Sequence, residues 1–146
     1  MLKVTPFLWF DTQAQEAAKF YVSLFPNSKV TSANPMMATF ELNGQTVYAI
    51  NGGPLYKFTE AFSFFVDCDT QEEVDQLWSK LTADGGEESQ CGWLKDKFGL
   101  SWQIIPTLLS KYLSDPDRAK ADRVMQVMLK MKKIDIALLQ KAYDQS

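Results

Sequence analysis

The apolar residues in the first half of the chain fall into short runs that predict one strand, one helix and three further strands. Residues 4–10 (VTPFLWF) predict the first strand. Asp11 then stands where a helix N-cap is expected, and apolar residues recur at helical spacing as far as Phe25. The three strands that follow are expected at residues 29–33, 36–42 and 46–50.

Two turn signals accompany these strands. Asn43-Gly44 is flanked by extended runs on both sides. This dipeptide favours a two-residue hairpin because both of its positions need a positive φ. Asn51-Gly52-Gly53-Pro54 follows the last strand. We interpret that run as a loop, with an anion-binding nest of backbone amides as the alternative.

The second half of the chain repeats the same order of elements. Residues 61–67 (AFSFFVD) predict an aromatic-rich strand, and Thr70 with Glu73 forms a capping box before a helix. The apolar stripe of that helix consists of Val74, Leu77, Trp78 and Leu81. Further strands are expected at residues 91–95 and 100–105, with a short extra strand near 87–90.

The two halves share an order of elements more than a sequence. Gly44-Gln-Thr-Val-Tyr-Ala-Ile can be aligned with Gly99-Leu-Ser-Trp-Gln-Ile-Ile, which makes Tyr48 and Gln103 equivalent. A repeat of this length predicts a duplicated α+β fold and not a solenoid, which needs three or more units. A ferredoxin-like βαββαβ domain is the rival, but it has fewer strands than this pattern offers.

We therefore expect one α+β domain in which residues 1–106 form two repeated units, about 1–54 and 55–106. Residues 107–146 are expected to form a helical C-terminal extension of the same domain. Its helices are expected at residues 107–113, at 118–132 and after Asp135. A methionine-rich stripe in this extension favours packing within the chain, with contact to another subunit or a peptide as the alternative.

Composition and charge exclude several partners. The formal net charge is −3 and the sequence lacks the basic stripe that nucleic-acid binding requires. We find neither a signal-peptide pattern nor an apolar stretch long enough to span a membrane. The two cysteines, Cys68 and Cys91, do not form a disulfide framework. These features predict a soluble protein of the reducing cytoplasm.

The sequence contains no histidine. This absence excludes a Ser-His-Asp triad, a Cys-His dyad and zinc sites that are built on imidazole. Any bound metal would need oxygen ligands, which suit harder divalent cations.

Three stretches of the sequence resemble a known family. They are Thr5-Pro-Phe-Leu-Trp-Phe-Asp with the Ala-Lys-Phe-Tyr that follows, Leu42-Asn-Gly-Gln with Asn51-Gly-Gly-Pro, and Cys91-Gly-Trp-Leu-Lys-Asp-Lys-Phe-Gly-Leu-Ser-Trp-Gln. The chain resembles the PhnB-like proteins of the vicinal-oxygen-chelate superfamily, which includes glyoxalases, bleomycin-resistance proteins and dioxygenases. This branch is often labelled 3-demethylubiquinone 3-methyltransferase, and the tail from Val124 also resembles it.

The resemblance implies paired βαβββ modules whose curved sheets enclose a cavity, and it implies a homodimer. In metal-dependent members, each module supplies one ligand from its first strand and one from its last. Those places fall near Val4 or Thr5, Tyr48, Ala61 or Phe62, and Gln103. Only Gln103 is a suitable oxygen ligand, so we expect no cofactor, and a divalent metal is only weakly supported. The methyltransferase label has no support from a strand, Gly-rich loop and helix of the nucleotide-binding kind.

Several residues are candidates for a ligand cavity or for catalysis. We expect the cavity to be lined by Phe7, Trp9, Tyr48, Trp93 and Gln103. Glu41 is the best candidate for a general base, provided that it points inward and its burial raises its pKa. Glu41 and Gln103 are also the only weak candidates for metal ligands.

These observations lead to one principal hypothesis and two alternatives. The principal hypothesis is a metal-free binding protein of the vicinal-oxygen-chelate type that holds an apolar or aromatic small molecule. The first alternative is an oxygen-ligated metalloenzyme of the glyoxalase, lyase or dioxygenase kind, so the sequence leaves open whether any reaction is catalysed. The second is an interaction module that uses the methionine-rich tail.

Overall fold

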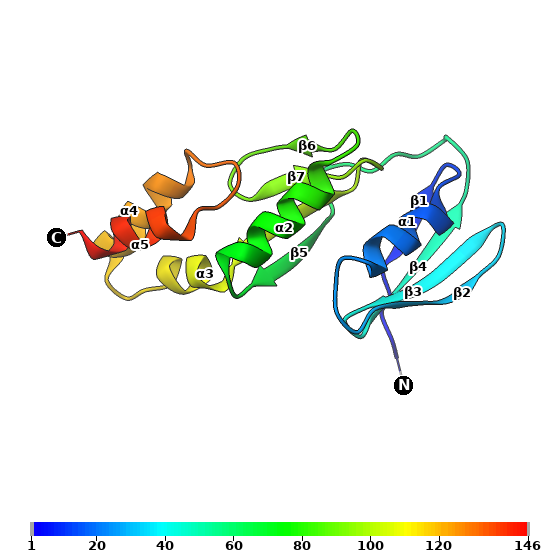
Figure 1. The fold of residues 1–146 in the computed structure, drawn as a ribbon, viewed down its shortest axis with the longest axis horizontal. Helices are drawn as coiled ribbons and strands as arrows, with labels where there is room; N and C mark the ends of the chain where they lie inside the picture. Colours follow the sequence, from blue (N-terminus) through cyan, green and yellow to red (C-terminus); the bar gives the residue numbers. More distant parts are fainter. Residues whose placement is uncertain (1, 146) are drawn as a thin grey trace. The chain divides into compact units, whose positions relative to one another are not determined.

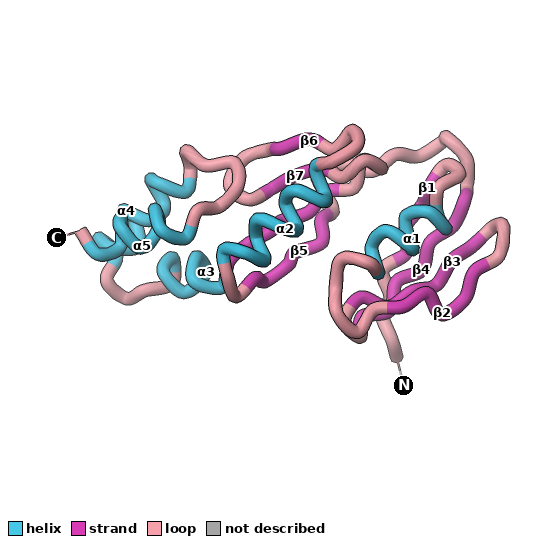
Figure 2. Tube along the Cα trace, in the orientation of Figure 1, coloured by secondary structure: helices cyan, strands magenta, loops and turns pink. Residues whose placement is uncertain are grey.

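The computed structural model of the protein describes residues 2–145. The chain divides into two compact units, residues 1–58 and residues 59–146 (Figures 1 and 2). Within the described part of the chain, each unit holds its own four-stranded mixed sheet, with one helix in the first unit and four in the second. No helix within residues 2–145 has the length and apolar character that a membrane span requires.

The first unit has the predicted order of one strand, one helix and three strands. Its elements are β1 (Phe7–Phe10), α1 (Ala14–Val22), β2 (Lys29–Ala33), β3 (Met37–Leu42) and β4 (Gln45–Asn51). The strand order is β1-β4-β3-β2, and β1 runs parallel to β4. Asn43 and Gly44 have φ angles of 46° and 88°, as the predicted hairpin between β3 and β4 requires.

Strand alternation gives this sheet one buried face and one open face. The buried face consists of Leu8, Phe10, Ala38, Phe40, Val47 and Ala49. It packs against the small residues and Tyr21 of α1, whose ring lies 6.1 Å from that of Phe40. Burial of these apolar side chains stabilises the unit by roughly 25 cal/mol for each Å² removed from water. The other face carries Phe7, Trp9 and Tyr48.

The prediction that Asp11 caps the first helix is wrong. The N-cap residue is Gln13, and its side chain makes no capping hydrogen bond. Instead, Asn51 Oδ1 accepts from the backbone N–H of Ala14 at 2.8 Å. The cap therefore comes from the end of β4, which only the folded sheet brings to the start of α1.

The second unit repeats this topology. Its elements up to the extension are β5 (Ser63–Cys68), α2 (Gln71–Thr82), β6 (Glu87–Glu88), β7 (Trp93–Lys95) and β8 (Ser101–Pro106). The strand order is β5-β8-β7-β6, and β5 runs parallel to β8. The predicted capping box of Thr70 and Glu73 is present. The same strand order in both sheets confirms the duplicated fold.

The strand expected at residues 91–95 begins two residues later, at Trp93. Cys91 and Gly92 have positive φ angles of 57° and 87° and cannot continue a strand. Their backbone N–H groups donate to the carbonyl oxygens of Met131 and Lys132, each at 2.8 Å. Contact with the C-terminal extension therefore determines the conformation of this turn.

The C-terminal extension forms three helices that pack into the second unit. They are α3 (Thr107–Leu113), α4 (Arg118–Met128) and α5 (Ile136–Asp144). Asp117 and Asp135 accept from backbone N–H groups at the starts of α4 and α5. The shared core consists of Ile105, Leu109, Val124, Met131, Ile134, Leu139 and Ala142. The methionine-rich stripe thus contributes to packing within the chain.

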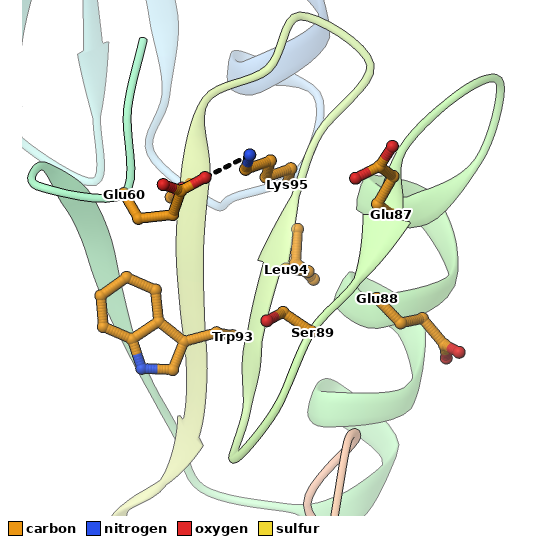
Figure 3. Close-up of a pocket in the computed structure, with 8 residues that line it drawn as sticks. Glu60, Glu87, Glu88, Ser89, Trp93, Leu94 and Lys95 are labelled. Atoms are coloured by element: carbon orange, nitrogen blue, oxygen red, sulfur yellow. Dashed lines mark ion pairs between the residues drawn. The ribbon is translucent and has the colours of Figure 1, made fainter.

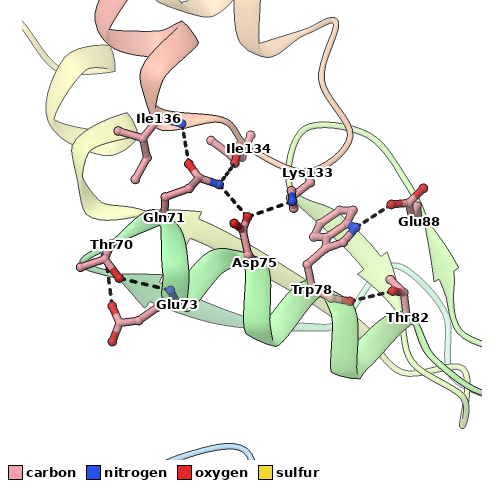
Figure 4. Close-up of polar contacts among 10 residues, drawn as sticks. All are labelled: Thr70, Gln71, Glu73, Asp75, Trp78, Thr82, Glu88, Lys133, Ile134 and Ile136. Atoms are coloured by element: carbon pink, nitrogen blue, oxygen red, sulfur yellow. Dashed lines mark hydrogen bonds and ion pairs between the residues drawn. The ribbon is translucent and has the colours of Figure 1, made fainter.

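The helix expected at residues 118–132 ends at Met128 because the next segment is held by hydrogen bonds to other elements. The side-chain amide of Gln71, at the start of α2, donates to the carbonyl oxygen of Ile134 at 3.0 Å and accepts from the N–H of Ile136 at 2.7 Å (Figure 4). Beside it, Lys133 forms an ion pair of 2.9 Å with Asp75.

Candidate functional site

Three of the predicted cavity residues lie together on the open face of the first sheet. Phe7 and Tyr48 are register partners on β1 and β4, and their rings meet edge to face with centroids 6.2 Å apart. Trp9 lies on the same face because it alternates with the buried Leu8 and Phe10. Phe7 is 53% exposed, which is unusual for a large aromatic side chain. Tyr48 is half-buried, and its hydroxyl can both donate and accept a hydrogen bond.

The loop after β4 determines the position of Trp9. The indole N–H of Trp9 donates to the carbonyl oxygen of Gly53 at 2.9 Å. A Cβ atom on Gly52 would lie only 2.4 Å from the same indole, so glycine is required there. Tyr56 packs edge to face against Trp9, with centroids 5.0 Å apart. The N–H groups of Gly52 and Gly53 donate to the carbonyl oxygens of Phe10 and Asp11 at 2.8 and 3.2 Å, which favours the loop interpretation over the anion nest.

Glu41, the candidate general base, lies on the open face of the same sheet and is half-buried. It pairs with Thr46 on β4 and Lys29 on β2, one row along the same face from Tyr48. It borders a wide surface hollow of about 500 Å³ formed largely by the turns at Asn27 and Asn43. This placement does not provide the deep burial that the general-base hypothesis needs.

The other two predicted cavity residues lie together on the second sheet. Trp93 and Gln103 are register partners on β7 and β8, and Phe65 on β5 continues the same row. The side-chain amide of Gln103 donates to Ser63 Oγ at 3.0 Å, which ties β8 to the start of β5. The two groups of predicted residues belong to different units, and each group is a feature of its own sheet.

A buried carboxylate that the sequence analysis did not identify holds β8 in place. Asp96 is 2% exposed. Its Oδ1 atom accepts from the N–H groups of Phe98 and Leu100 at 2.8 and 3.0 Å, and its Oδ2 atom accepts from the indole of Trp102 at 2.9 Å. The turn pattern between Asp96 and Gly99 was the only sequence signal of this role.

A hollow of about 240 Å³ lies beside Trp93 on the second sheet (Figure 3). Its lining consists of Glu60, Glu87, Glu88, Ser89, Trp93, Leu94, Lys95 and Ser101. Lys95 forms an ion pair with Glu60. The hydrogen bond from Lys95 lowers the pKa of Glu60, and the same bond raises the pKa of Lys95.

The residues at the expected metal-ligand positions do not fit a divalent cation. Val4, Thr5, Ala61 and Phe62 precede strands β1 and β5, and the register partners of Tyr48 and Gln103 in those strands are the phenylalanines Phe7 and Phe65. The only oxygen ligands left at these positions are then the phenol of Tyr48 and the amide of Gln103, whereas hard cations prefer several carboxylates. Within residues 2–145, no three Cys, Asp or Glu side chains are grouped closely enough to hold a metal ion.

The two cysteines of the described chain are both free thiols. Burial raises the pKa of the Cys68 thiol to about 12, and the nearby carboxylate of Glu73 acts in the same direction. Cys91 Sγ lies 3.6 Å from the carbonyl oxygen of Met128. Cys68 is therefore a packing residue and not a nucleophile.

Comparisons with known proteins agree with the sequence resemblance. The family model described as 3-demethylubiquinone-9 3-methyltransferase matches residues 2–105. A solved PhnB protein from Bacillus cereus, described with the same methyltransferase name, is 35% identical, with a TM-score of 0.66; the alignment covers 72% of this chain and 99% of that one. A comparison with curated proteins gave no match.

Two more distant structures share the fold alone. A glyoxalase-related enzyme from Fulvimarina pelagi is 16% identical, with a TM-score of 0.53, and the match covers 74% of this chain and 91% of that one. The fosfomycin resistance protein FosX from Listeria monocytogenes, solved with Mn(II) and sulfate, is 17% identical, with a TM-score of 0.55 and coverage of 77% and 98%.

The family match ends before the C-terminal extension, so it does not support the resemblance noted for the tail from Val124. It covers both sheets, the open aromatic face of the first and the Trp93–Gln103 row of the second. Together with the duplicated strand order, this match shows that the chain belongs to the PhnB-like family of the vicinal-oxygen-chelate superfamily, whose family model carries the name 3-demethylubiquinone-9 3-methyltransferase.

Proposed function

We propose that this protein is a metal-free binding protein that holds an apolar or aromatic small molecule on the open aromatic face of its sheets. The superfamily contains proteins that bind small molecules or metals, which leaves both classes available. The observation that carries the proposal is the exposure of Phe7 beside Tyr48 and Trp9 on a sheet face that no helix of its unit covers. Aromatic walls with a few polar groups are typical of small-molecule sites.

The geometry supports a rigid platform on the first sheet. The Trp9 ring is fixed by its bond to Gly53, and Phe7 is braced by the Tyr48 ring. Little conformational entropy is lost when a flat ligand stacks on side chains that are already ordered. The hydroxyl of Tyr48 can supply one directional hydrogen bond to such a ligand.

The donor set counts against the metalloenzyme alternative. Glu41 lies at an open surface hollow, and Gln103 offers a cation only its amide oxygen, since its N–H group donates to Ser63. A metal-dependent role for either residue would need a cation, which one phenol and one amide are poorly suited to hold.

The experiment is a titration with 1-naphthol, followed by the amide resonances of isotopically labelled protein. We expect saturable shifts at β1 and β4 and at least a roughly tenfold weaker affinity in Phe7→Ala and Tyr48→Ala, a loss of about 1.4 kcal/mol. Leu138→Ala, which removes a similarly exposed apolar side chain from α5, is the control. Shifts that are unchanged in Phe7→Ala and Tyr48→Ala would refute the proposal.

Thermal melts with Mn²⁺, Mg²⁺, Ni²⁺ and Zn²⁺ test the metal-free part of the proposal. A ligand that binds the native state raises the melting temperature by mass action. We expect no saturable rise, and a saturable rise with any of the four ions would favour the metalloenzyme.

We also propose that the protein acts as a homodimer in the cytoplasm. The dimer follows from the family resemblance, and the free thiols of Cys68 and Cys91 suit a reducing compartment. Light scattering after size-exclusion chromatography would contradict the dimer if it gave the mass of a single 16.6 kDa chain.

A further inference from the structure

A buried hydroxyl in the second sheet has no hydrogen-bond partner. Ser101 is 1% exposed, and its Oγ atom makes no hydrogen bond to any residue between 2 and 145. A buried polar atom without a partner is costly, and such atoms are few in native proteins. Ser101 also lines the hollow of about 240 Å³ beside Trp93, so a group bound there could satisfy the hydroxyl.

An ion pair spans the strand that carries this serine. Lys95 on β7 is the register partner of Ser101, and Ser63 on β5 pairs with Ser101 from the opposite side. Glu60 lies three residues before Ser63, so the side chain of Lys95 crosses β8 to reach it (Figure 3). The two side chains that form the ion pair are 38% and 63% exposed, and ion pairs as exposed as this contribute little to stability. The Glu60–Lys95 ion pair can therefore open at low cost.

The opened hollow would present two opposite charges, one hydroxyl and one aromatic wall. Lys95 supplies three N–H donors and Glu60 an acceptor, while Ser101 can both donate and accept. The indole of Trp93 borders the same space. Of the remaining carboxylates, Glu88 accepts from the indole of Trp78 at 2.7 Å, and Glu87 adds negative charge at the edge.

These charges select the class of ligand. A ligand with one charge would pair with Glu60 or Lys95 and leave the other without its partner. A zwitterion would pair with both, and its carboxylate or ammonium could also reach the Ser101 hydroxyl. The volume lies below the roughly 300–1,000 Å³ of sites for drug-sized ligands, so the compound must be small.

We infer that the hollow is a binding site for a small zwitterionic amino compound with an aromatic or apolar side chain. The ammonium group binds Glu60, the carboxylate binds Lys95, Ser101 adds a hydrogen bond, and the side chain lies against Trp93. This inference goes beyond the proposed function, because the hollow lies within the second unit and takes a ligand that carries two charges.

The test compares three probes that share one ring. L-phenylalanine carries both charges, phenethylamine only the positive charge and 3-phenylpropionate only the negative one. We titrate each into labelled full-length protein and follow the amide resonances of β7 and β8. L-phenylalanine should bind at least about tenfold more tightly than either of the others. Equal binding of phenethylamine or 3-phenylpropionate, or no saturable shift with L-phenylalanine, would overturn the inference.

Three variants assign the contacts. Ser101→Ala should weaken L-phenylalanine binding several-fold while the melting temperature does not fall, because its hydroxyl stabilises nothing in the free protein. Ser110→Ala, at an exposed position on α3, is the matched control. Glu60→Lys and Lys95→Glu should each abolish binding, and the two changes combined should restore it, since a zwitterion can bind in the reverse orientation. Failure of the combined variant to restore binding would contradict the paired-charge geometry.

The outcomes separate this inference from the proposed function. If 1-naphthol shifts the amide resonances of β1 and β4 but L-phenylalanine shifts no resonances, the proposed aromatic site on the first sheet is supported and the zwitterion site is refuted. If L-phenylalanine binds and 1-naphthol does not, the apolar platform is refuted and the hollow stands as an independent site.

Discussion

Asn51 Oδ1 accepts a hydrogen bond from the backbone N–H of Ala14 at 2.8 Å, so a residue at the end of β4 caps α1. The same side chain donates to Gln15 Oε1 and to the carbonyl oxygen of Pro35, at 2.9 and 3.1 Å. One amide thus ties together the helix, the β2–β3 turn and the strand that carries Tyr48.

Removal of the Asn51 amide should destabilise the first unit. We expect Asn51→Ala to lower the free energy of unfolding by about 1–3 kcal/mol, since loss of a helix cap alone costs about 0.5–2 kcal/mol. Urea denaturation measures the change. Asp11→Ala is the control and should stay within about 0.5 kcal/mol of the parent protein. A larger loss in Asp11→Ala than in Asn51→Ala would mean that Asp11 caps the helix after all.

Replacement of Asp96 by its amide tests the buried carboxylate. In Asp96→Asn, an NH₂ group replaces one of the two oxygens that accept hydrogen bonds. Whichever oxygen is replaced, the NH₂ donor then faces another donor, either the indole N–H of Trp102 or the N–H groups of Phe98 and Leu100. We expect a loss of about 2–4 kcal/mol, with a changed near-ultraviolet spectrum of Trp102. Asp67→Asn, on an exposed position of β5, should be close to neutral. An equal effect of the two substitutions on the free energy of unfolding would show that the Asp96 carboxylate is no more important for stability than an exposed one.

The contact between Gln71 and the extension should control the stability of the tail. Gln71→Ala leaves the Ile134 carbonyl and the Ile136 N–H without this partner, and we expect a loss of about 1–3 kcal/mol. Hydrogen exchange should become faster in α5. Gln76→Ala removes a glutamine from the exposed side of the same helix and serves as the control. Unchanged exchange in α5 would show that the apolar core alone holds the extension.

Gly92 and Gly99 form a matched pair for steric crowding, because both have a φ angle of 87°. A Cβ atom on Gly92 would lie 2.5 Å from Ile105 Cδ1 and 3.2 Å from Ile134 Cγ1, whereas nothing lies within 4 Å of one on Gly99. In both alanine variants, backbone strain should lower the free energy of unfolding by about 1–2 kcal/mol. In Gly92→Ala, overpacking should lower it by about 1–3 kcal/mol more. Equal melting temperatures for the two variants would contradict the close packing of the extension at Gly92.

Alkaline conditions should weaken the fold through Cys68. Burial raises the pKa of this thiol to about 12, whereas the pKa of a cysteine in an unfolded chain is about 8.5. Between these values the unfolded chain binds fewer protons than the folded one, so the free energy of unfolding falls as pH rises. Cys68→Ala should reduce this slope in urea titrations from pH 8 to 10. An unaltered slope in Cys68→Ala would show that other groups cause the alkaline loss.

Local chemistry made most of the fold predictable from sequence. The alternation of Phe7 and Trp9 with Leu8 and Phe10 placed the aromatic pair on one face of a strand, because side chains alternate in any extended chain. The Asn43-Gly44 turn and the Thr70–Glu73 capping box were confirmed, since each depends on residues a few positions apart. The alignment of Tyr48 with Gln103 also agrees with their matching places in the two sheets.

Interactions between distant residues decided the rest. The cap from Asn51, the turn of Cys91 and Gly92 against residues 131–132 and the end of α4 at Met128 all depend on hydrogen bonds between segments far apart in the chain. The pairing of Lys95 with Glu60 across Ser101 likewise follows from strand order. Periodicity determines which side of an element a residue occupies, whereas its partners there depend on how the strands and helices pack together.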